Sequence, residues 1–64
     1  MDEKIDPVKM FSLKKGTRIR LKDNRIIELT SDYIQESVSY TYKEVGKTTE
    51  DTISCLRLSG CRII

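Results

Sequence analysis

The chain of 64 residues contains no histidine and no tryptophan, and it has only one proline, three glycines and two cysteines. Without histidine it lacks the usual general base of neutral pH, and its serine, threonine and cysteine side chains have no imidazole that would activate them as nucleophiles. A chain this short also offers little concave surface for a substrate pocket. We therefore expect that the protein is not an enzyme.

Metal ligands and apolar runs are equally scarce. Cys55 and Cys61 are too few for the four-ligand site that structural zinc requires, so only a site shared across a dimer would supply enough thiolates. We expect two free thiols, no metal and no cofactor. No apolar run approaches 18 residues, and the N-terminal MDEKIDP is acidic and polar, unlike an ordinary signal peptide. These features predict a cytoplasmic protein without a membrane span.

The apolar residues that are present suffice for one small core. Eight Ile, five Leu, three Val and one Phe predict a single domain over 1–64. A chain of this size buries only about 60% of its unfolded surface, so it is marginally stable alone. A homo-oligomer would add stability, and a chain that ends on Ile63-Ile64 must bury that end in its own fold or against a neighbour. Ile63 and Ile64 are therefore the predicted oligomer edge.

Charge is distributed unevenly along a chain whose formal net charge is only +2. The segment 9–25 holds seven basic residues and one acid, whereas the rest of the chain holds five basic residues and nine acids. This asymmetry is typical of a face that binds polyanions, although a solvated strand face gives the same pattern. The seven basic residues are Lys9, Lys14, Lys15, Arg18, Arg20, Lys22 and Arg25.

The segment 14–30 predicts a β-hairpin with this positive charge on one face. Residues 17–22 alternate between β-formers and basic residues, which is the period of a strand with one buried and one solvated face. Asp23-Asn24 is a turn signal, because both side chains bond to nearby backbone and Asn tolerates a positive φ. Residues 25–30 then form the return strand.

The hydrophobic pattern also predicts the register of this hairpin. A two-residue loop would place Glu28 beside Ile19 on the buried face. A loop one residue longer keeps the apolar residues together, so we expect that register. Its predicted pairs are Leu21 with Ile27, Ile19 with Leu29, and Arg20 with Glu28.

Before the hairpin, residues 1–5 are expected to fray. Asp6-Pro7 predicts a helix start, with Asp6 as the N-cap, and the short helix covers residues 7–14. Its apolar face packs Phe11 onto the sheet, and Gly16 is a natural stop.

After the hairpin, a third strand is expected over 33–44, with a bulge or bend near Glu36 because a carboxylate there interrupts the apolar face. Tyr40 and Tyr42 fall on that face and are predicted to be core residues, although exposed tyrosines would instead offer a platform for bases. Residues 45–51 form a polar loop around the turn residue Gly46; the upstream glycine of a phosphate-binding loop is absent.

The last part of the chain predicts two more strands. Residues 52–58 form the fourth strand, with a helix beginning near Thr48 as the alternative. Ser59-Gly60 ends this strand, and residues 61–64 form a short fifth strand. The expected fold is therefore mainly β, a small and strongly bent five-stranded antiparallel barrel with a short N-terminal helix.

This order of features resembles the Sm-like (Lsm and Hfq) barrels. The resemblance rests on Gly16, on the run Ile19-Arg20-Leu21-Lys22-Asp23-Asn24-Arg25, and on the ending Leu58-Ser59-Gly60-Cys61-Arg62-Ile63-Ile64, and it covers residues 7–64. It implies an RNA-binding barrel that works as a ring. Other SH3-like barrels, such as KOW and Tudor domains, fit the same number of strands, and a shared fold does not fix a function.

The sequence is compatible with three functions. The first is a module that binds nucleic acid, RNA more readily than DNA, through phosphate contacts and base stacking on Tyr33 or Tyr42. The second is a protein-binding adaptor or inhibitor, such as a small phage or mobile-element accessory protein, in which the basic hairpin meets an acidic partner or a sheet edge pairs with a partner strand. The third is a homo-oligomer that functions only as a ring. The residues predicted to bind nucleic acid or an acidic partner are Lys14, Lys15, Arg18, Arg20, Lys22, Arg25, Tyr33 and Tyr42.

Overall fold

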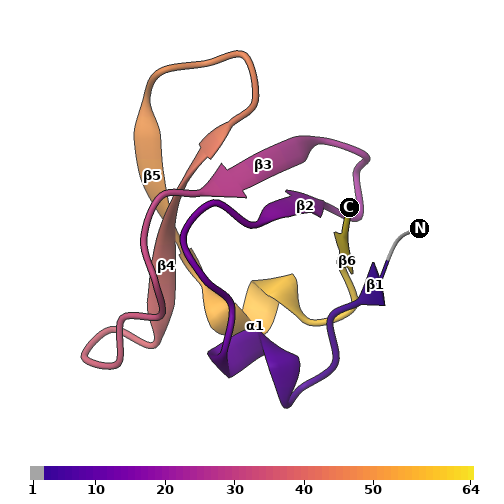
Figure 1. Ribbon diagram of the computed structural model, residues 1–64, viewed down its shortest axis with the longest axis vertical. Helices are drawn as coiled ribbons and strands as arrows, with labels where there is room; N and C mark the ends of the chain where they lie inside the picture. Colours follow the sequence, from indigo (N-terminus) through magenta and orange to yellow (C-terminus); the bar gives the residue numbers. More distant parts are fainter. Residues whose placement is uncertain (1–2) are drawn as a thin grey trace.

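Six short strands form one antiparallel sheet in the order β1-β6-β2-β3-β4-β5 in the computed structural model, which describes residues 3–64. The edges of the sheet are β1 and β5; they do not pair within residues 3–64, so this sheet is not closed into a barrel. In Figure 1, α1 lies at one end of the molecule, and the β4–β5 hairpin projects at the other. The elements are β1 (Glu3–Lys4), the 3-10 turn η1 (Lys9–Phe11), β2 (Arg18–Arg20), β3 (Ile26–Leu29), β4 (Ser39–Glu44), β5 (Glu50–Ser54), α1 (Cys55–Leu58) and β6 (Arg62–Ile63).

The N-terminal segment is more ordered than its sequence predicted. Fraying was expected over 1–5, but β1 pairs with β6 and Ile5 is fully buried. The backbone N–H of Ile5 donates to the carbonyl of Cys61 at 2.9 Å, which ties the two ends of the chain together. Burial of Ile5 favours this order, and the prediction was wrong for residues 3–5; residues 1–2 lie outside the described part of the chain.

The helix expected over 7–14 is reduced to the single turn η1. The carboxylate of Asp6 does cap this turn, accepting hydrogen bonds from the backbone N–H groups of Val8 and Lys9 at 3.0 and 2.7 Å. The turn ends early because Leu13 enters the core, where its N–H bonds to a tyrosine hydroxyl instead of a helical carbonyl. Phe11 was expected to pack onto the sheet; its side chain is 44% exposed, and its ring contacts the ring of Tyr33.

The β2–β3 hairpin forms with the predicted faces but not with the predicted partners. Ile19 lies opposite Ile27, and Arg18 lies opposite Glu28. The loop has three residues, as expected, but it begins one residue earlier: the N–H of Asn24 donates to the carbonyl of Leu21 at 2.9 Å, and Asn24 has a φ of 71°. A three-residue loop of this kind needs a left-handed residue at its end, and Asn tolerates that conformation.

Two of the later elements also differ from the sequence prediction. The strand expected over 33–44 is limited to β4, because Ile34 and Ser39 pair across a tight turn that contains Glu36. The strand expected over 52–58 ends at Ser54, whose hydroxyl accepts a hydrogen bond from the N–H of Leu56 and so caps α1. In both places a polar side chain, Glu36 in the first and Ser54 in the second, favours a turn or a helix cap over a continued strand.

The core lies on the inner face of the curved sheet, and η1 and α1 contribute to it. Tyr40 is its largest fully buried residue; its hydroxyl donates to the carbonyl of Met10 at 2.7 Å and accepts from the N–H of Leu13 at 3.1 Å. The prediction that Tyr40 is a core residue is confirmed. Cys55 and Cys61 are buried free thiols, as expected. The buried apolar residues are Ile5, Met10, Leu13, Ile19, Ile27, Leu29, Tyr40, Ile53, Cys55, Leu58 and Cys61.

Candidate anion-binding surface

The outer face of the sheet carries two rows of side chains that cross the strands side by side. In the first, which we call the alternating row, basic and acidic residues take turns from β2 to β5. Arg18 Nε and Glu28 Oε1 are 3.2 Å apart in this row. Opposite charges on neighbouring strands attract, so the row is self-compensating. Its members are Arg18, Glu28, Lys43 and Glu50, each directly opposite the next.

In the second row, which we call the basic row, the cross-strand neighbours on β1, β6 and β2 are all basic. Lys4 of β1 lies opposite Arg62 of β6, and Arg62 lies opposite Arg20 of β2. All three side chains are exposed. Beyond Arg20 the row continues with Ile26 of β3. Like charges directly opposite each other on a sheet repel, whereas opposite charges attract, so the cross-strand pairs of the two rows differ in sign.

A hollow of about 290 Å³ opens next to the basic row, at the tip of the β2–β3 hairpin. We call it the basic hollow. Among residues 3–64, its lining includes the cations Arg20, Lys22 and Arg62 and no acidic residue. The remaining lining residues are Leu21, Asn24, Gly60 and Cys61. A concave site with one sign of charge attracts counter-ions, here anions.

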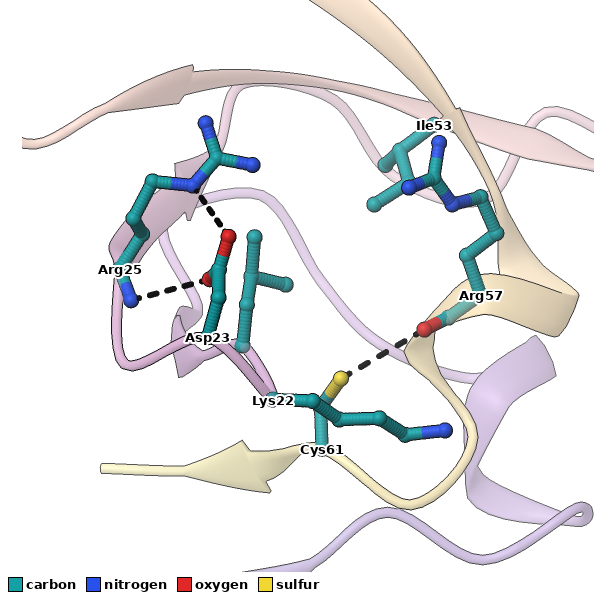
Figure 2. A pocket seen from close by; sticks show the side chains of 7 residues that line it. Lys22, Asp23, Arg25, Ile53, Arg57 and Cys61 are labelled. Carbon is teal, nitrogen blue, oxygen red and sulfur yellow. Dashed lines mark hydrogen bonds and ion pairs between the residues drawn. The ribbon is translucent and has the colours of Figure 1, made fainter.

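A second depression, a cleft of about 310 Å³, lies on the other side of the hairpin tip. Figure 2 shows Arg25 and Arg57 on opposite sides of this cleft, with Ile53 beside Arg57 and Cys61 at the base. Its charges are partly paired: Arg25 Nε donates to Asp23 Oδ2 at 2.8 Å, and Arg25 NH1 is 3.6 Å from Glu44 Oε1.

The hydrogen bonds around Asp23 hold the pKa of its carboxyl below the usual range. The backbone N–H of Arg25 is the largest cause, and the guanidinium of the same residue adds to it, while partial desolvation opposes both. Asp23 therefore stays ionised at neutral pH and offsets part of the positive charge of the cleft. Among residues 3–64, three cations and no acid line the basic hollow, so its lining favours an anion more than the lining of the cleft does.

The structure separates the cations that the sequence grouped together. Arg20 and Lys22 line the basic hollow, and Lys22 also lines the cleft with Arg25, whereas Arg18 belongs to the alternating row. Lys14 and Lys15 are exposed at the other end of β2, where the N–H of Lys15 bonds to Asp32. The eight predicted binding residues therefore do not form one site.

The two predicted stacking tyrosines do not lie beside these cations. Tyr42 is on the inner face of β4, opposite Leu29, whereas Arg20 points outward. Tyr33 is half-buried, and its ring contacts the rings of Phe11 and Tyr40 at centroid distances of 5.7 and 5.6 Å. Both tyrosines pack against the core, and the structure does not bring either one to the basic hollow.

The predicted oligomer edge is part of the sheet interior. β6 pairs with β1 on one side and β2 on the other, so the backbone of Ile63 is already hydrogen-bonded within the chain. Ile63 is half-buried, and Ile64 is 42% exposed. The backbone of this end is thus paired within the chain while the side chain of Ile64 stays exposed, and assembly into an oligomer stays a prediction.

The sequence prediction missed Lys4, Arg57 and Arg62. Arg62 was visible as a polar residue between the apolar neighbours of a short strand, which indicates an outward side chain. Its position beside Arg20 depends on β6 pairing with β2, a contact between segments about 40 residues apart that no local pattern reveals.

Neither a metal site nor a membrane helix is found in the described part of the chain: residues 3–64 contain no cluster of three His, Cys, Asp or Glu side chains suited to a metal ion, and no long apolar helix that could cross a bilayer. Comparison with known proteins found no matching family model, no similar curated protein and no similar solved structure.

Proposed function

We propose that the protein is a small, non-enzymatic module that binds the phosphates of a nucleic acid through the basic row and the basic hollow. The observation that carries this proposal is the placement of Lys4, Arg62 and Arg20 side by side on three adjacent strands. Neighbouring strands are about 4.8 Å apart, so the row spans roughly 10 Å of surface. Electrostatic contacts with phosphates supply most of the affinity of such a surface.

The shape of the surface favours a single strand, and we propose RNA as the target. The helix α1 has only four residues, so it offers no recognition helix for the major groove of a duplex. A single strand lays its backbone along a sheet and leaves its bases free for neighbouring side chains. Ile26, which is next to Arg20, supplies apolar surface for such a contact.

We also infer that the sheet belongs to the class of SH3-like small barrels, of which the Sm-like proteins are one group. The strand order supports this inference. β2 to β5 form an antiparallel meander, the short helix α1 follows, and β6 returns to pair with the first strand of the meander. This arrangement curls the sheet around one core, as a small barrel requires.

The proposed function is tested by fluorescence anisotropy with a mixed-sequence single-stranded RNA at 50 and 200 mM salt. Three phosphate contacts give a slope of about −2 in log K against log salt, so we expect the affinity to fall roughly 20-fold between these conditions. The same measurement with single-stranded DNA shows the preference for RNA. Affinity that does not depend on salt, or no binding at 50 mM, would contradict the proposal.

A protein-binding adaptor is the second candidate, and exposed apolar side chains favour it. Val8 is 79% exposed and Leu56 is 65% exposed, and they lie next to η1 and in α1, two elements that contact each other. Exposed apolar surface of this kind is typical of protein contacts. A protein partner would stay bound at high salt, and L56S would weaken its binding more than R62Q.

A further inference from the structure

The cleft beside the hairpin tip combines apolar and charged side chains. Its volume of about 310 Å³ falls in the range of small-molecule sites, which are lined by apolar groups and a few polar ones that fix the orientation of the ligand. Leu21 is half-buried in its lining, and Ile53 and Cys61 are 7% and 2% exposed. A flat ligand with apolar faces suits such a lining, and in a nucleic acid the bases have this character.

Arg57 forms one side of the cleft with its guanidinium available to a ligand. In Figure 2 this guanidinium lies beside Ile53, across the cleft from Arg25. Within residues 3–64, Arg57 makes its hydrogen bond through the backbone carbonyl, which accepts from the thiol of Cys61 at 3.5 Å, and the guanidinium has no ion pair. A guanidinium plane stacks on the face of an unpaired base, which is a common mode of single-strand recognition.

Asp23 supplies a hydrogen-bond acceptor to the same cleft. Its Oδ1 accepts from the backbone N–H of Arg25 at 3.2 Å, and its Oδ2 accepts from Arg25 Nε at 2.8 Å. These two bonds fix the orientation of the carboxylate. Because a carboxylate offers about four acceptor positions, some remain for a ligand, and an ionised carboxylate selects a ligand that presents donors.

The four bases of RNA differ in what they present to such a carboxylate. Guanine has two donors side by side on its Watson–Crick edge, N1–H and the N2 amino group. In adenine and cytosine the amino group adjoins a ring nitrogen that is an acceptor, and in uracil the N3–H lies between two carbonyl oxygens. A carboxylate therefore forms two parallel hydrogen bonds with guanine and one at most with each of the other bases.

We propose that the cleft is a base pocket that selects guanine, with Asp23 accepting from N1–H and the N2 amino group and Arg57 stacking on the ring. This inference rests on the proposed function and adds a sequence preference to it. Leu21, Lys22 and Cys61 line both the cleft and the basic hollow, so the two depressions adjoin each other. A strand whose phosphates contact the basic hollow therefore has its bases within reach of the cleft.

The test uses a short oligouridine, labelled at one end, in which one central nucleotide is kept or replaced by guanosine, adenosine or cytidine. In fluorescence anisotropy at 50 mM salt, we expect the guanosine form to bind about tenfold more tightly than the other three, as a good bidentate contact to a base would allow. D23N should reduce this preference to less than about twofold, because its amide nitrogen donates where guanine also donates. Its affinity for oligouridine should not fall, since it removes a negative charge.

Two matched variants serve as controls. D51N removes the same charge from an exposed aspartate that does not line the cleft, and it should keep the preference for guanosine. R57Q should weaken binding of the guanosine form about fivefold through lost stacking, whereas K47Q, which removes an exposed cation outside the cleft, should not. Because Asp23 and Arg57 are exposed, D23N and R57Q are expected to keep the fold, which circular dichroism would show.

Mononucleotides provide a second readout that does not require a strand. Guanosine 5′-monophosphate should shift the backbone amide NMR signals of Asp23, Arg25 and Arg57 more than adenosine 5′-monophosphate does at the same concentration. Both ligands carry the same phosphate and a purine, so the difference reports the edge of the base. D23N should remove this difference, and D51N should keep it.

The outcomes separate this inference from the proposed function. Equal binding of the four oligomers, or a guanosine preference that survives D23N, would overturn the base pocket while leaving general RNA binding in place. No binding of any oligomer, together with shifts by guanosine 5′-monophosphate that D23N abolishes, would overturn the proposed function and support the cleft as a site for a free guanine nucleotide. No response to either kind of ligand would overturn both.

Discussion

The alternating row and the basic row lie on the same face of the same sheet, yet their charges are arranged in opposite ways. In the alternating row, Arg18 and Lys43 each face a glutamate across the strand, whereas in the basic row Arg62 has Lys4 on one side and Arg20 on the other. Cross-strand pairs contribute about 0.2–1 kcal/mol each, stabilising when the charges are opposite and destabilising when they are alike. The cross-strand pairs of the first row therefore stabilise the fold, whereas those of the second oppose it, and under the proposed function a ligand that brings negative charge would offset that repulsion.

The largest effect is expected when two cations are removed from one row or from the other. R20Q/R62Q and R18Q/K43Q change the net charge equally. At 50 mM salt, R20Q/R62Q should weaken RNA binding about 60-fold, because each lost phosphate contact accounts for about a factor of eight through counterion release. R18Q/K43Q should weaken it less than about threefold, through long-range charge alone. Equal losses would mean that net charge, and not the basic row, governs binding.

A core substitution should separate stability from binding. Y40F leaves the N–H of Leu13 and the carbonyl of Met10 without their buried partner, which should lower the free energy of unfolding by about 1–3 kcal/mol. The RNA affinity of the folded protein should not change, because Tyr40 is on the inner face. Urea denaturation and anisotropy would measure the two quantities. A loss of RNA affinity in fully folded Y40F would show that Tyr40 affects binding, and would contradict this prediction.

The hydroxyl of Tyr40 should also make the stability of the protein depend on pH in the alkaline range. Burial raises the pKa of Tyr40 above its ordinary value near 10. The folded state therefore retains this proton to a higher pH than the unfolded state does. The contribution of the neutral hydroxyl to the free energy of unfolding is complete below pH 10 and is lost as the pH rises through the folded pKa. Urea denaturation at pH 7 and above pH 10 should show this decline in the wild-type protein and a smaller one in Y40F.

The smallest effects compare the two rows in the absence of ligand. K43E would place three acidic residues side by side in the alternating row and should lower the free energy of unfolding by about 0.2–1 kcal/mol. R62E would place an acid between two cations in the basic row and should raise it by a similar amount. Denaturation of both variants at low salt would measure these changes. Changes of the same sign would contradict our explanation of the two rows.

The hairpin shows how far the sequence alone could predict this fold. Alternation correctly assigned Ile19 and Ile27 to the buried face, because that pattern is local. The predicted cross-strand partners were wrong. The predicted and observed registers differ by two residues and bury the same side chains, so the apolar pattern does not distinguish them. The conformation of Asn24 selects between them, and local apolar pattern does not reveal it.

The candidate site was harder to predict than the fold. Arg20 and Lys22 were identified from the density of basic residues, but Arg18 and Arg25 have the same local character and were separated only by their neighbours in the folded chain. Lys4 and Arg62 come from the two ends of the chain and meet Arg20 only because β6 lies between β1 and β2. Charge density along the sequence thus indicated a binding surface, and the long-range pairing of strands determined its members.

The salt dependence of RNA affinity in the wild-type protein and in R20Q/R62Q tests the central claim most directly. Our account predicts a slope of about −2 for the wild-type protein and about −0.7 for the variant, since two of three phosphate contacts are removed. R18Q/K43Q should keep the wild-type slope. Identical slopes for all three proteins would show that the basic row does not contact the phosphates, and would contradict the account.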